Sequence, residues 1–424
     1  MRVTVYPGNI NGAAVAPSSK SMTQRAYAAA LLHHGTTIIS NAGDSNDELA
    51  ALDAIQALGA TIKQRTRGKI EISSTGVVPI TDTVNVGESG LAARLFIPIA
   101  AVSDQRLTIT GEDTLLKRPL TGVEQSLKAL GAKLLNFNGF IPISIQGPVV
   151  PDNITVDASG GSQLVSGLLF ALSYAAQQPI TLTVQKLTSK PYIDMTLAVL
   201  AQCGRPITHK QYKEFDIDPV AFTVPEQVTI NVEGDWSGAA NLLVAGAIAG
   251  DVIVNNLDIH SQQADRAIYD ILHNAGADIA VSGSSIQVKN SRLNGFEYDA
   301  TDSPDLFPIL AVLAANCMGD SRITGVHRLF AKESNRAESI SEMLEGFDVP
   351  FSIEDDTLCI EGVQKLRGTV IDGYADHRIV MAAAVGALNA SGQVDINGAE
   401  AVNKSYPGFF NTLSLLGVNT TAGR

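Results

Sequence analysis

Residues 123–134 read VEQSLKALGAKL, an amphipathic helix pattern that leads into a glycine turn and then a strand. The same pattern recurs along the whole chain. The other copies are LDAIQALGATI from Leu52, TLAVLAQCGRPI from Thr196, AIYDILHNAGADI from Ala267, SISEMLEGFDVPF from Ser339 and FFNTLSLLGV from Phe409. The turn glycines are Gly59, Gly131, Gly204, Gly276, Gly346 and Gly417, which are 72, 73, 72, 70 and 71 residues apart. The sequence therefore predicts six repeats that together span the chain.

Each repeat also contains a second helix that is more apolar. These helices begin near Ser21, Gly90, Ser162, Ser237, Asp305 and His377. A β-rich run such as TTIIS or DVIVNN follows each of them, and strands such as KIEIS or SIQVK follow the glycine turns. Because 424 residues exceed what one hydrophobic core usually serves, the six repeats predict two globular domains of three repeats each. The alternative is a repeat scaffold that binds a protein partner, although this period is long for a solenoid.

The composition indicates large cores and excludes a general polyanion binder. Hydrophobic residues make up 45% of the chain and charged residues 17%, which argues against disorder. The net charge is −13 and no basic stripe is present, so we expect no nucleic-acid partner. The uncharged run 158–185 is rich in Ser and Gln and contains Pro179. It predicts a buried helix, a turn and a strand rather than a membrane span.

The N-terminus and the cysteines bear on the compartment of the protein. MRVTVYPGNI alternates like a strand and does not have the pattern of a signal or transit peptide. Cys203, Cys317 and Cys359 form no CxxC pair and no Cys/His cluster. We therefore expect reduced structural thiols, no metal site and a cytoplasmic protein without a membrane segment.

The starts of the apolar helices carry the residues that point to chemistry. A helix N-terminus has unpaired N–H groups and the positive end of the helix dipole, so it attracts anions. PSSKSMTQR places Lys20 and Ser21 at such a start and Arg25 one turn inside, and GESGLAARLF repeats this plan with Gly90 and Arg94. Singly, each is equally well explained as a helix cap with a solvated charge. Their recurrence in apolar helices, where a buried charge needs a partner, indicates a bound anion.

Three further helix starts follow the same plan. DASGGSQLVSG offers neutral hydrogen-bonding groups on Ser162 and Gln163, and GYADHRIVMA places His377 and Arg378 before an apolar helix. Asp305 opens the helix of TDSPDLFPIL, where a charge that complements the helix dipole is the simpler explanation. The loops add cations at matching points of the repeats: Lys117, Arg118, Lys190, Arg328, Lys332, Arg336 and Lys404. Since the chain has no Walker A, dinucleotide or metal motif, this pattern predicts small metabolites with phosphate and carboxylate groups, bound without a cofactor.

The sequence resembles the EPSP synthases from Val15 to Phe410. The resemblance rests on an ordered set of motifs: PSSKSMTQR, KRPL, SKPYIDMT, AKESNRAESI, DGYADHRIVMA and NKSYPGFF. It implies an α/β fold of two similar globular domains, each made of three βαβαββ-like units, as an inside-out α/β barrel. Residues 1–18 with 234–424 would form the first domain, from repeats four to six, and residues 19–233 the second, from repeats one to three. The active site would lie in the cleft between the two domains.

The resemblance also implies an activity. EPSP synthases transfer the enolpyruvyl group of phosphoenolpyruvate to the 5-hydroxyl of shikimate 3-phosphate, a step of aromatic amino-acid biosynthesis that releases phosphate. They use no cofactor or metal, and we expect a monomer. The expected contacts of shikimate 3-phosphate are Lys20, Ser21, Arg25, Ser162, Gln163, Ser189, Tyr192, Asp305 and Lys332. Those of phosphoenolpyruvate are Lys20, Gly90, Arg118, Gln163, Arg336, Arg378 and Lys404.

The chemical roles follow from the same resemblance, which implies addition and then elimination. Asp305 would take the proton from the 5-hydroxyl. Glu333 or Lys20 would protonate the methylene carbon of phosphoenolpyruvate. Arg94 and His377 would line the same region, with His377 counted among the catalytic residues.

Three positions depart from the family pattern. Gly161 replaces a serine that often precedes the glutamine, Arg328 stands where many members carry Asn, and residues 88–91 read ESGL instead of Asn-Ala-Gly-Thr. The related UDP-N-acetylglucosamine enolpyruvyl transferases are the second candidate, but they usually carry Lys-Asn in place of Lys20-Ser21 and many have a cysteine near the KRPL position. Retention of Gly90 implies inhibition by glyphosate, which competes with phosphoenolpyruvate in this family.

Overall fold

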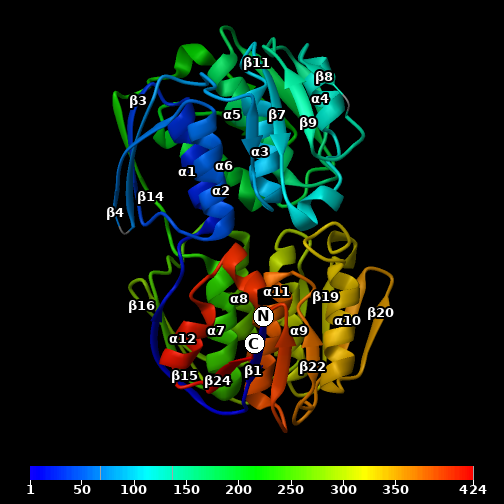
Figure 1. Cartoon of the computed structure of the whole chain (residues 1–424). Helices are drawn as coiled ribbons and strands as arrows, with labels where there is room; N and C mark the ends of the chain where they lie inside the picture. The colour runs from blue at the N-terminus through cyan, green and yellow to red at the C-terminus, as the bar shows by residue number, and fades with distance from the viewer. Residues whose placement is uncertain (67, 136, 424) are drawn as a thin grey trace. The chain divides into compact units, whose positions relative to one another are not determined.

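The computed structural model describes residues 1–66, 68–135 and 137–423. The chain divides into two compact units, which we name by their continuity in sequence. The continuous unit is Ser18–Val232, and the discontinuous unit combines Met1–Pro17 with Glu233–Arg424. Both ends of the chain lie in the discontinuous unit (Figure 1).

The continuous unit contains three four-stranded sheets, with strand orders β14-β3-β5-β4, β6-β7-β9-β8 and β10-β11-β13-β12. Its helices are α1 (Lys20–Leu32), α2 (Asn46–Ala57), α3 (Gly90–Ala100), α4 (Val123–Ala129), α5 (Ser162–Ala175) and α6 (Lys190–Gln202), with short 3₁₀ turns η1 (Asp113–Lys117) and η2 (Pro219–Ala221). Its strands are β3 (Gly35–Ser40), β4 (Thr61–Thr66), β5 (Lys69–Ser74), β6 (Thr83–Asn85), β7 (Arg106–Thr110), β8 (Lys133–Leu135), β9 (Ile143–Gln146), β10 (Ile154–Asp157), β11 (Ile180–Gln185), β12 (Thr208–Lys210), β13 (Glu214–Ile217) and β14 (Gln227–Asn231).

The discontinuous unit has the same plan, with strand orders β16-β17-β15-β2, β18-β19-β21-β20 and β22-β23-β1-β24. Its helices are α7 (Trp236–Ala249), α8 (Ala267–Asn274), α9 (Phe307–Ala315), α10 (Arg336–Phe347), α11 (His377–Gly386) and α12 (Phe409–Leu415), with 3₁₀ turns η3 (Ala264–Arg266), η4 (Pro304–Leu306), η5 (Val326–Arg328), η6 (Ala387–Asn389) and η7 (Ala399–Lys404). Its strands are β1 (Arg2–Val5), β2 (Ile10–Val15), β15 (Gly250–Asn255), β16 (Asp278–Ser282), β17 (Ser285–Lys289), β18 (Glu297–Asp299), β19 (Asp320–Thr324), β20 (Phe351–Glu354), β21 (Thr357–Glu361), β22 (Val370–Asp372), β23 (Val394–Asn397) and β24 (Thr420–Gly423).

Each sheet combines one parallel pair with antiparallel neighbours. In the third repeat, β10 pairs in parallel with β11, and Val156 lies opposite Val184. A parallel pair needs a crossover connection, and the apolar helix α5 supplies it. The strands β12 and β13 that follow α6 then pair antiparallel to each other, and β13 pairs antiparallel to β11. The repeat is therefore βαβαββ, as the family resemblance implied.

Where the chain passes from one unit to the other, the last strand before the crossing pairs with a sheet of the unit that the chain is leaving. β2 directly precedes α1 in the sequence, yet it pairs in parallel with β15 of the discontinuous unit. β14 directly precedes α7, yet it pairs in parallel with β3 of the continuous unit. β1 completes the last sheet by pairing with β23 and β24. Each unit thus holds three complete βαβαββ repeats only because the chain crosses twice.

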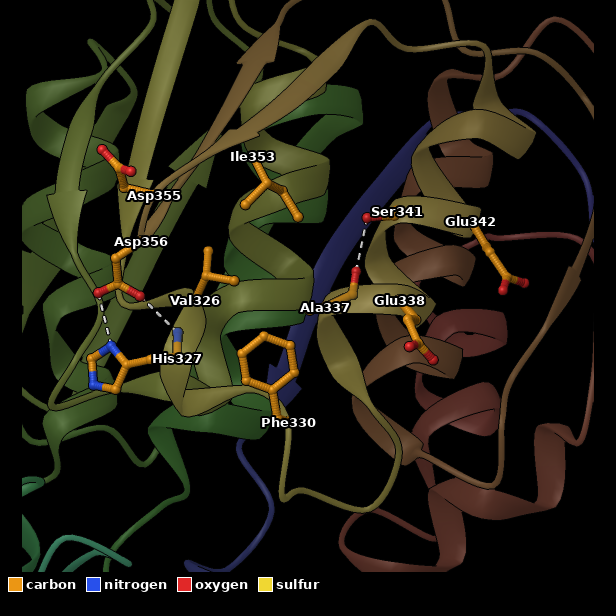
Figure 2. A pocket seen from close by; sticks show the side chains of 10 residues that line it. All are labelled: Val326, His327, Phe330, Ala337, Glu338, Ser341, Glu342, Ile353, Asp355 and Asp356. Atoms are coloured by element: carbon orange, nitrogen blue, oxygen red, sulfur yellow. Dashed lines mark hydrogen bonds and ion pairs between the residues drawn. The ribbon is translucent and has the colours of Figure 1, made fainter.

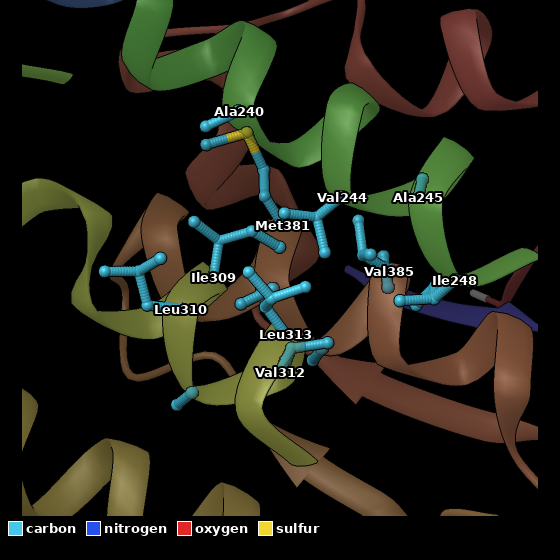
Figure 3. Close-up of a cluster of buried hydrophobic side chains, with 14 of the residues drawn as sticks. Ala240, Val244, Ala245, Ile248, Ile309, Leu310, Val312, Leu313, Met381 and Val385 are labelled. Atoms are coloured by element: carbon cyan, nitrogen blue, oxygen red, sulfur yellow. The ribbon is translucent and has the colours of Figure 1, made fainter. Parts of the chain in front are cut away.

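The apolar helices form the core of each unit. All residues of α7, α9 and α11 are buried. Figure 3 shows side chains of these helices packed together, among them Val244, Leu313 and Met381. A helix that is apolar on all sides must be buried all round, which leaves its polar N-terminus as the part free to face a ligand. The sequence prediction that run 158–185 is a buried helix followed by a strand is confirmed by α5 and β11.

A glycine lets two of these helices approach closely in the continuous unit. Pro98 lies inside α3 and has no N–H to donate to the carbonyl of Arg94. A Cβ atom at Gly167 of α5 would lie only 2.3 Å from that carbonyl oxygen. The backbones of α3 and α5 therefore meet where the helix ladder is interrupted, and any side chain at position 167 would force them apart.

Five of the six predicted turn glycines have a positive φ angle, between 74° and 112°. The sixth prediction was wrong, because Gly346 lies inside α10. The left-handed position of that turn belongs to Asp348, with φ 64°. Aspartate tolerates this conformation because its short polar side chain can bond to the nearby backbone. The repeat is intact, and only the residue that ends the helix differs.

Two other sequence expectations concern membranes and thiols. Among the helices of the described residues, none combines the length and apolarity needed to cross a bilayer. The three cysteines are free thiols, and Cys203 and Cys317 are buried. Burial raises the pKa of Cys203 to about 11 and that of Cys317 to about 12, so both stay protonated at neutral pH.

Candidate active site

The starts of the three apolar helices meet inside the continuous unit. Ser89, the N-cap of α3, donates a hydrogen bond to Oε1 of Gln24 in α1 at 3.1 Å. Arg94 of α3 donates to Oε1 of Gln163 at the start of α5 at 3.3 Å and to its own Gly90 carbonyl at 3.0 Å. Within this unit the sequence-predicted residues of repeats one to three therefore share one region.

Arg25 is a fully buried cation held by neutral groups. Its Nε donates to Oγ1 of Thr196 at 2.9 Å, and its Nη atoms donate to the carbonyls of Ser21 at 2.8 Å and Tyr192 at 3.1 Å. Burial lowers the pKa of Arg25 to about 10, against an opposing effect of Tyr192, so the guanidinium stays protonated at neutral pH. These acceptors orient the charge without cancelling it, which favours an anion nearby.

Lys20 stands at the N-terminus of α1 beside an acid that the sequence analysis missed. Its Nζ lies 2.9 Å from Oδ2 of Asp47, in the first turn of α2, and both side chains are largely buried. Asp47 matches the usual preference for acids in a first helical turn, so nothing in the local pattern marked it as a partner of Lys20. Ser21 follows at the same helix start and is half-buried.

Arg118 lies against the N-terminus of α3. A Cβ atom at Gly90 would be 2.7 Å from Cζ of Arg118, so any other residue there would require the guanidinium to shift. The carboxylate of Glu88 accepts a hydrogen bond from Oγ1 of Thr114 at 3.1 Å and so anchors η1, the turn that leads to Arg118. The unusual Glu88 therefore has a structural partner here.

The α5 and α6 starts explain another departure from the family pattern. Gly161 is the N-cap of α5 with φ 108° and ψ 179°, a conformation that L side chains rarely adopt. The glycine is thus required by the backbone as this chain builds it. Ser162 is buried at the helix start, Ser189 is a buried left-handed N-cap of α6, and the ring of Tyr192 lies 5.9 Å from Cζ of Arg25.

The discontinuous unit brings its three apolar helix starts together as well. Nη2 of Arg378 in α11 donates to Oγ of Ser237 in α7 at 2.6 Å and lies 3.4 Å from Oδ2 of Asp305 in η4, just before α9. The helix starts of repeats four to six therefore lie together within this unit. Whether all six starts serve one cleft remains a prediction.

Asp305 is surrounded by cations. Its carboxylate lies 2.7 Å from Nη1 of Arg336, 3.3 Å from Nζ of Lys332 and 3.4 Å from Nη2 of Arg378. Burial by itself would raise the pKa of Asp305, but these three cations hold it well below the usual value. The side chain is still 27% exposed, so an ionised and accessible carboxylate lies among three cations.

Asp376 holds this cluster in place, a role that the sequence analysis did not assign. It is fully buried, its two oxygens accept hydrogen bonds from Nε and Nη2 of Arg336 at 2.8 and 3.2 Å, and it caps α11 by accepting from the N–H of Arg378 at 2.9 Å. It also accepts from Ser334 at 3.1 Å. Its place directly before His377 and Arg378, at a helix start, was the signal that could have identified it.

Three other predicted residues lie beside this cluster. Glu333 accepts from Nη2 of Arg336 at 2.8 Å, and Lys404 is buried and donates to the carbonyl of Ala375 at 2.7 Å. His377 is buried, with Nδ1 3.9 Å from Asp376. Burial lowers the pKa of Lys332, and Arg336 and Arg328 act in the same direction, whereas Asp305 and Glu333 oppose them.

The cluster of Asp305 with Lys332, Arg336 and Arg378 combines two chemical abilities. An accessible carboxylate can accept a proton from a hydroxyl, and fixed cations beside it can stabilise charge that develops on phosphate or carboxylate groups. Within the described part of the chain, His, Cys, Asp and Glu side chains form no group of three that could hold a metal ion.

Comparisons with known proteins show the family of this chain. The sequence profile of the family described as EPSP synthase (3-phosphoshikimate 1-carboxyvinyltransferase) matches residues 5–413. A relative named 3-phosphoshikimate 1-carboxyvinyltransferase from Thermococcus kodakarensis is 37% identical over 96% of this chain and 98% of its own length. One of the same name from Clostridium novyi is 33% identical over 98% and 97%.

Solved structures show the same fold. An EPSP synthase from Acinetobacter baumannii has a TM-score of 0.82 and 25% identity, covering 99% of this chain and all of its own. The enolpyruvyl transferase NikO from Streptomyces tendae has a TM-score of 0.78 at 15% identity, covering 99% and 98%, which supports the fold alone. The chain therefore belongs to the EPSP synthase, or 3-phosphoshikimate 1-carboxyvinyltransferase, family.

Proposed function

We propose that this protein transfers the enolpyruvyl group of phosphoenolpyruvate to the 5-hydroxyl of shikimate 3-phosphate and releases phosphate. Family membership supports the reaction. The observation that carries it at the level of residues is Asp305, an accessible carboxylate held among Lys332, Arg336 and Arg378. This combination supplies a proton acceptor and an anion-binding group in one place.

Asp305 is the base in this proposal. Its lowered pKa keeps it ionised, which is necessary for a base but also weakens its affinity for a proton. When anionic substrates bind the same cations, the cations are partly neutralised and their hold on Asp305 weakens. Substrate binding thus raises the basicity of the carboxylate at the moment when the proton has to be accepted.

The reaction proceeds through a tetrahedral intermediate. The 5-oxygen loses its proton to Asp305 and bonds to C2 of phosphoenolpyruvate, while an acid protonates C3. In the second stage C3 loses a proton, the bond from C2 to the phosphate oxygen breaks, and the enol ether forms. We assign the acid to Glu333 or Lys20 and keep His377 as a further catalytic candidate. All three are at most slightly exposed: Lys20 begins α1, His377 begins α11, and Glu333 contacts Arg336.

Each substrate is assigned residues of both units. We assign the contacts of shikimate 3-phosphate to Lys20, Ser21, Arg25, Ser162, Gln163, Ser189, Tyr192, Asp305 and Lys332. We assign those of phosphoenolpyruvate to Lys20, Gly90, Arg118, Gln163, Arg336, Arg378 and Lys404. The buried charge of Arg25, with its neutral acceptors, supports a phosphate site in the continuous unit.

The test is a titration with shikimate 3-phosphate, with and without phosphoenolpyruvate, followed by measurement of phosphate release. We expect saturable binding and release of phosphate only when both substrates are present. UDP-N-acetylglucosamine in place of shikimate 3-phosphate is the control, and turnover with it alone would instead support the related transferase. No turnover with either acceptor would contradict the proposal.

Three finer properties belong to the same proposal. A net charge of −13 favours a monomer through repulsion between copies, which sedimentation tests. Cell fractionation tests the cytoplasmic location. Glyphosate is expected to compete with phosphoenolpyruvate because Gly90 is retained, and inhibition that does not depend on phosphoenolpyruvate concentration would oppose this.

A further inference from the structure

A cavity of about 430 Å³ lies in the discontinuous unit, outside the charged cluster of Asp305. Its apolar lining consists of Val326 from η5, Phe330 from the following loop, Ala337 from α10 and Ile353 from β20. Phe330 is 60% exposed and Ile353 is 44% exposed, so both apolar side chains remain largely open to solvent. The volume falls in the range of small-molecule sites, about 300–1,000 Å³.

Carboxylates stand on both sides of this apolar lining. Asp355 and Asp356 come from the turn between β20 and β21, and Glu338 and Glu342 come from one face of α10. Figure 2 shows the apolar side chains in the middle, with the two aspartates on one side and the two glutamates on the other. The only basic lining residue is His327, whose Nδ1 lies 2.8 Å from Oδ2 of Asp356.

This combination selects one class of ligand. The carboxylates repel anions, and a fully apolar ligand would displace water from them without supplying a positive charge. Within the protein, Asp356 accepts a hydrogen bond from the N–H of His327 at 2.7 Å and Glu342 accepts one from the hydroxyl of Tyr374. A cation is attracted both to the carboxylates and to the exposed face of the Phe330 ring. An apolar body attached to the cation would cover Val326 and Ile353, whose exposure to water is unfavourable.

We propose that this cavity is a binding site for an organic cation that combines an ammonium group with an aromatic or branched aliphatic body. Phe330 and Ala337 flank the segment that carries Lys332 and Arg336, yet no side chain is shared between the cavity and the charged cluster. The site is therefore distinct from the one that holds the anionic substrates, and its ligand has the opposite charge.

The experiment uses phenethylammonium as the probe, with 2-phenylethanol and phenylacetate as its neutral and anionic counterparts. Binding to the full chain is measured by calorimetry or ligand-observed NMR. The test variant is Glu338→Gln with Glu342→Gln, here called the rim variant, which removes two of the carboxylate charges that line the cavity. The matched control is Glu297→Gln with Asp278→Asn, which removes two exposed charges of the same unit away from the cavity. A melting curve of each variant confirms that it is folded.

We expect saturable binding of phenethylammonium, weaker binding of 2-phenylethanol and no binding of phenylacetate. The rim variant should weaken phenethylammonium binding by about three- to tenfold, as expected for two exposed charges, whereas the control variant leaves it unchanged. Phe330→Leu should weaken it as well, because the ring is lost. The proposal is overturned if phenethylammonium does not saturate, if the neutral alcohol binds equally well, or if both double variants have the same effect.

Discussion

The buried arginines Arg25 and Arg336, one in each unit, are held in opposite ways. In the continuous unit, the buried Arg25 is held by the hydroxyl of Thr196 and by backbone carbonyls, which orient the cation but leave its charge. In the discontinuous unit, the buried Arg336 contacts three carboxylates, those of Asp305, Glu333 and Asp376. The first arrangement keeps a net positive charge, and the second approaches neutrality.

The two arrangements suit the two arginines to different tasks. A cation without a carboxylate partner is suited to hold a doubly charged phosphate, since the ligand supplies the missing charge. A balanced cluster cannot hold anions as strongly, but it fixes an ionised carboxylate where a proton has to move. In the proposed function, Arg25 therefore serves mainly to hold a phosphate, and Arg336 also holds the base Asp305 in position.

Asp305→Asn should show the largest effect. The amide keeps the shape but cannot accept the proton from the 5-hydroxyl, so we expect turnover to fall about 100- to 10,000-fold while shikimate 3-phosphate still binds. Steady-state rates and a binding titration measure the two quantities. Asp270→Asn, on the exposed surface of α8, is the control. Near-normal turnover would remove Asp305 as the base and direct attention to Glu333.

Asp376→Asn and Thr196→Val test, through the free energy of unfolding, how Arg336 and Arg25 are held. Loss of the buried Asp376 charge should cost about 3 kcal/mol, at the low end for a broken buried ion pair because Asp305 and Glu333 still face Arg336. Loss of the Thr196 hydroxyl should cost about 2 kcal/mol, within the range for a hydrogen bond to a charged group, because it accepts from Arg25 and also contacts Ser166 and the carbonyl of Tyr192. Urea denaturation compares the two. Equal costs would mean that Arg25 and Arg336 do not differ in the way described.

Arg118→Ala and Arg378→Ala remove one cation from each unit. Each should weaken phosphoenolpyruvate binding by about 1.5–3 kcal/mol, the range for a lost hydrogen bond to a charged group. Binding of shikimate 3-phosphate should change less in both. Equilibrium titrations with each substrate separate these effects. Unchanged affinity for phosphoenolpyruvate in both variants would refute the assignment of these residues.

Gly90→Ala tests the contact between Arg118 and the start of α3. Its methyl group would lie 2.7 Å from Cζ of Arg118, so the guanidinium must move, and we expect phosphoenolpyruvate binding to weaken by about 1–2 kcal/mol. The control is Gly346→Ala in α10, where the nearest atom would be at an ordinary 3.5 Å. That variant should keep its affinity and gain up to about 1 kcal/mol of stability from helix propensity.

The pH dependence of stability should show the smallest effect. The pKa of Asp305 is lower in the folded protein than in the unfolded chain, so its ionised form stabilises the fold at neutral pH. This contribution is complete above about pH 4, the unfolded value, and is lost as the pH falls through the folded pKa. The difference in unfolding free energy between wild type and Asp305→Asn should therefore be constant from about pH 5 to pH 8 and shrink below about pH 4. A difference that grows on acidification would contradict the shift.

Much of the architecture and of the candidate site could be read from the sequence. The apolar helices, the strands that follow them and five of the six glycine turns are local patterns, and the sequence determined them because periodicity and backbone conformation depend on neighbouring residues. The cations at the helix starts were visible for the same reason. After α10 the glycine pattern predicted the wrong turn residue, because Asp348 and not Gly346 adopts the left-handed conformation.

Only the tertiary structure decided which remote segments became neighbours. No local feature of β2 or β14 indicates that each pairs with a sheet of the other part of the chain, because strand pairing depends on which partner is available after folding. Asp47 and Asp376 likewise look like ordinary acids at helix starts, and their contacts with Lys20 and Arg336 connect residues 27 and 40 positions apart. The sequence by itself fixed where charges enter the apolar helices. Folding decided which of those charges are balanced, because the partner carboxylates come from other elements.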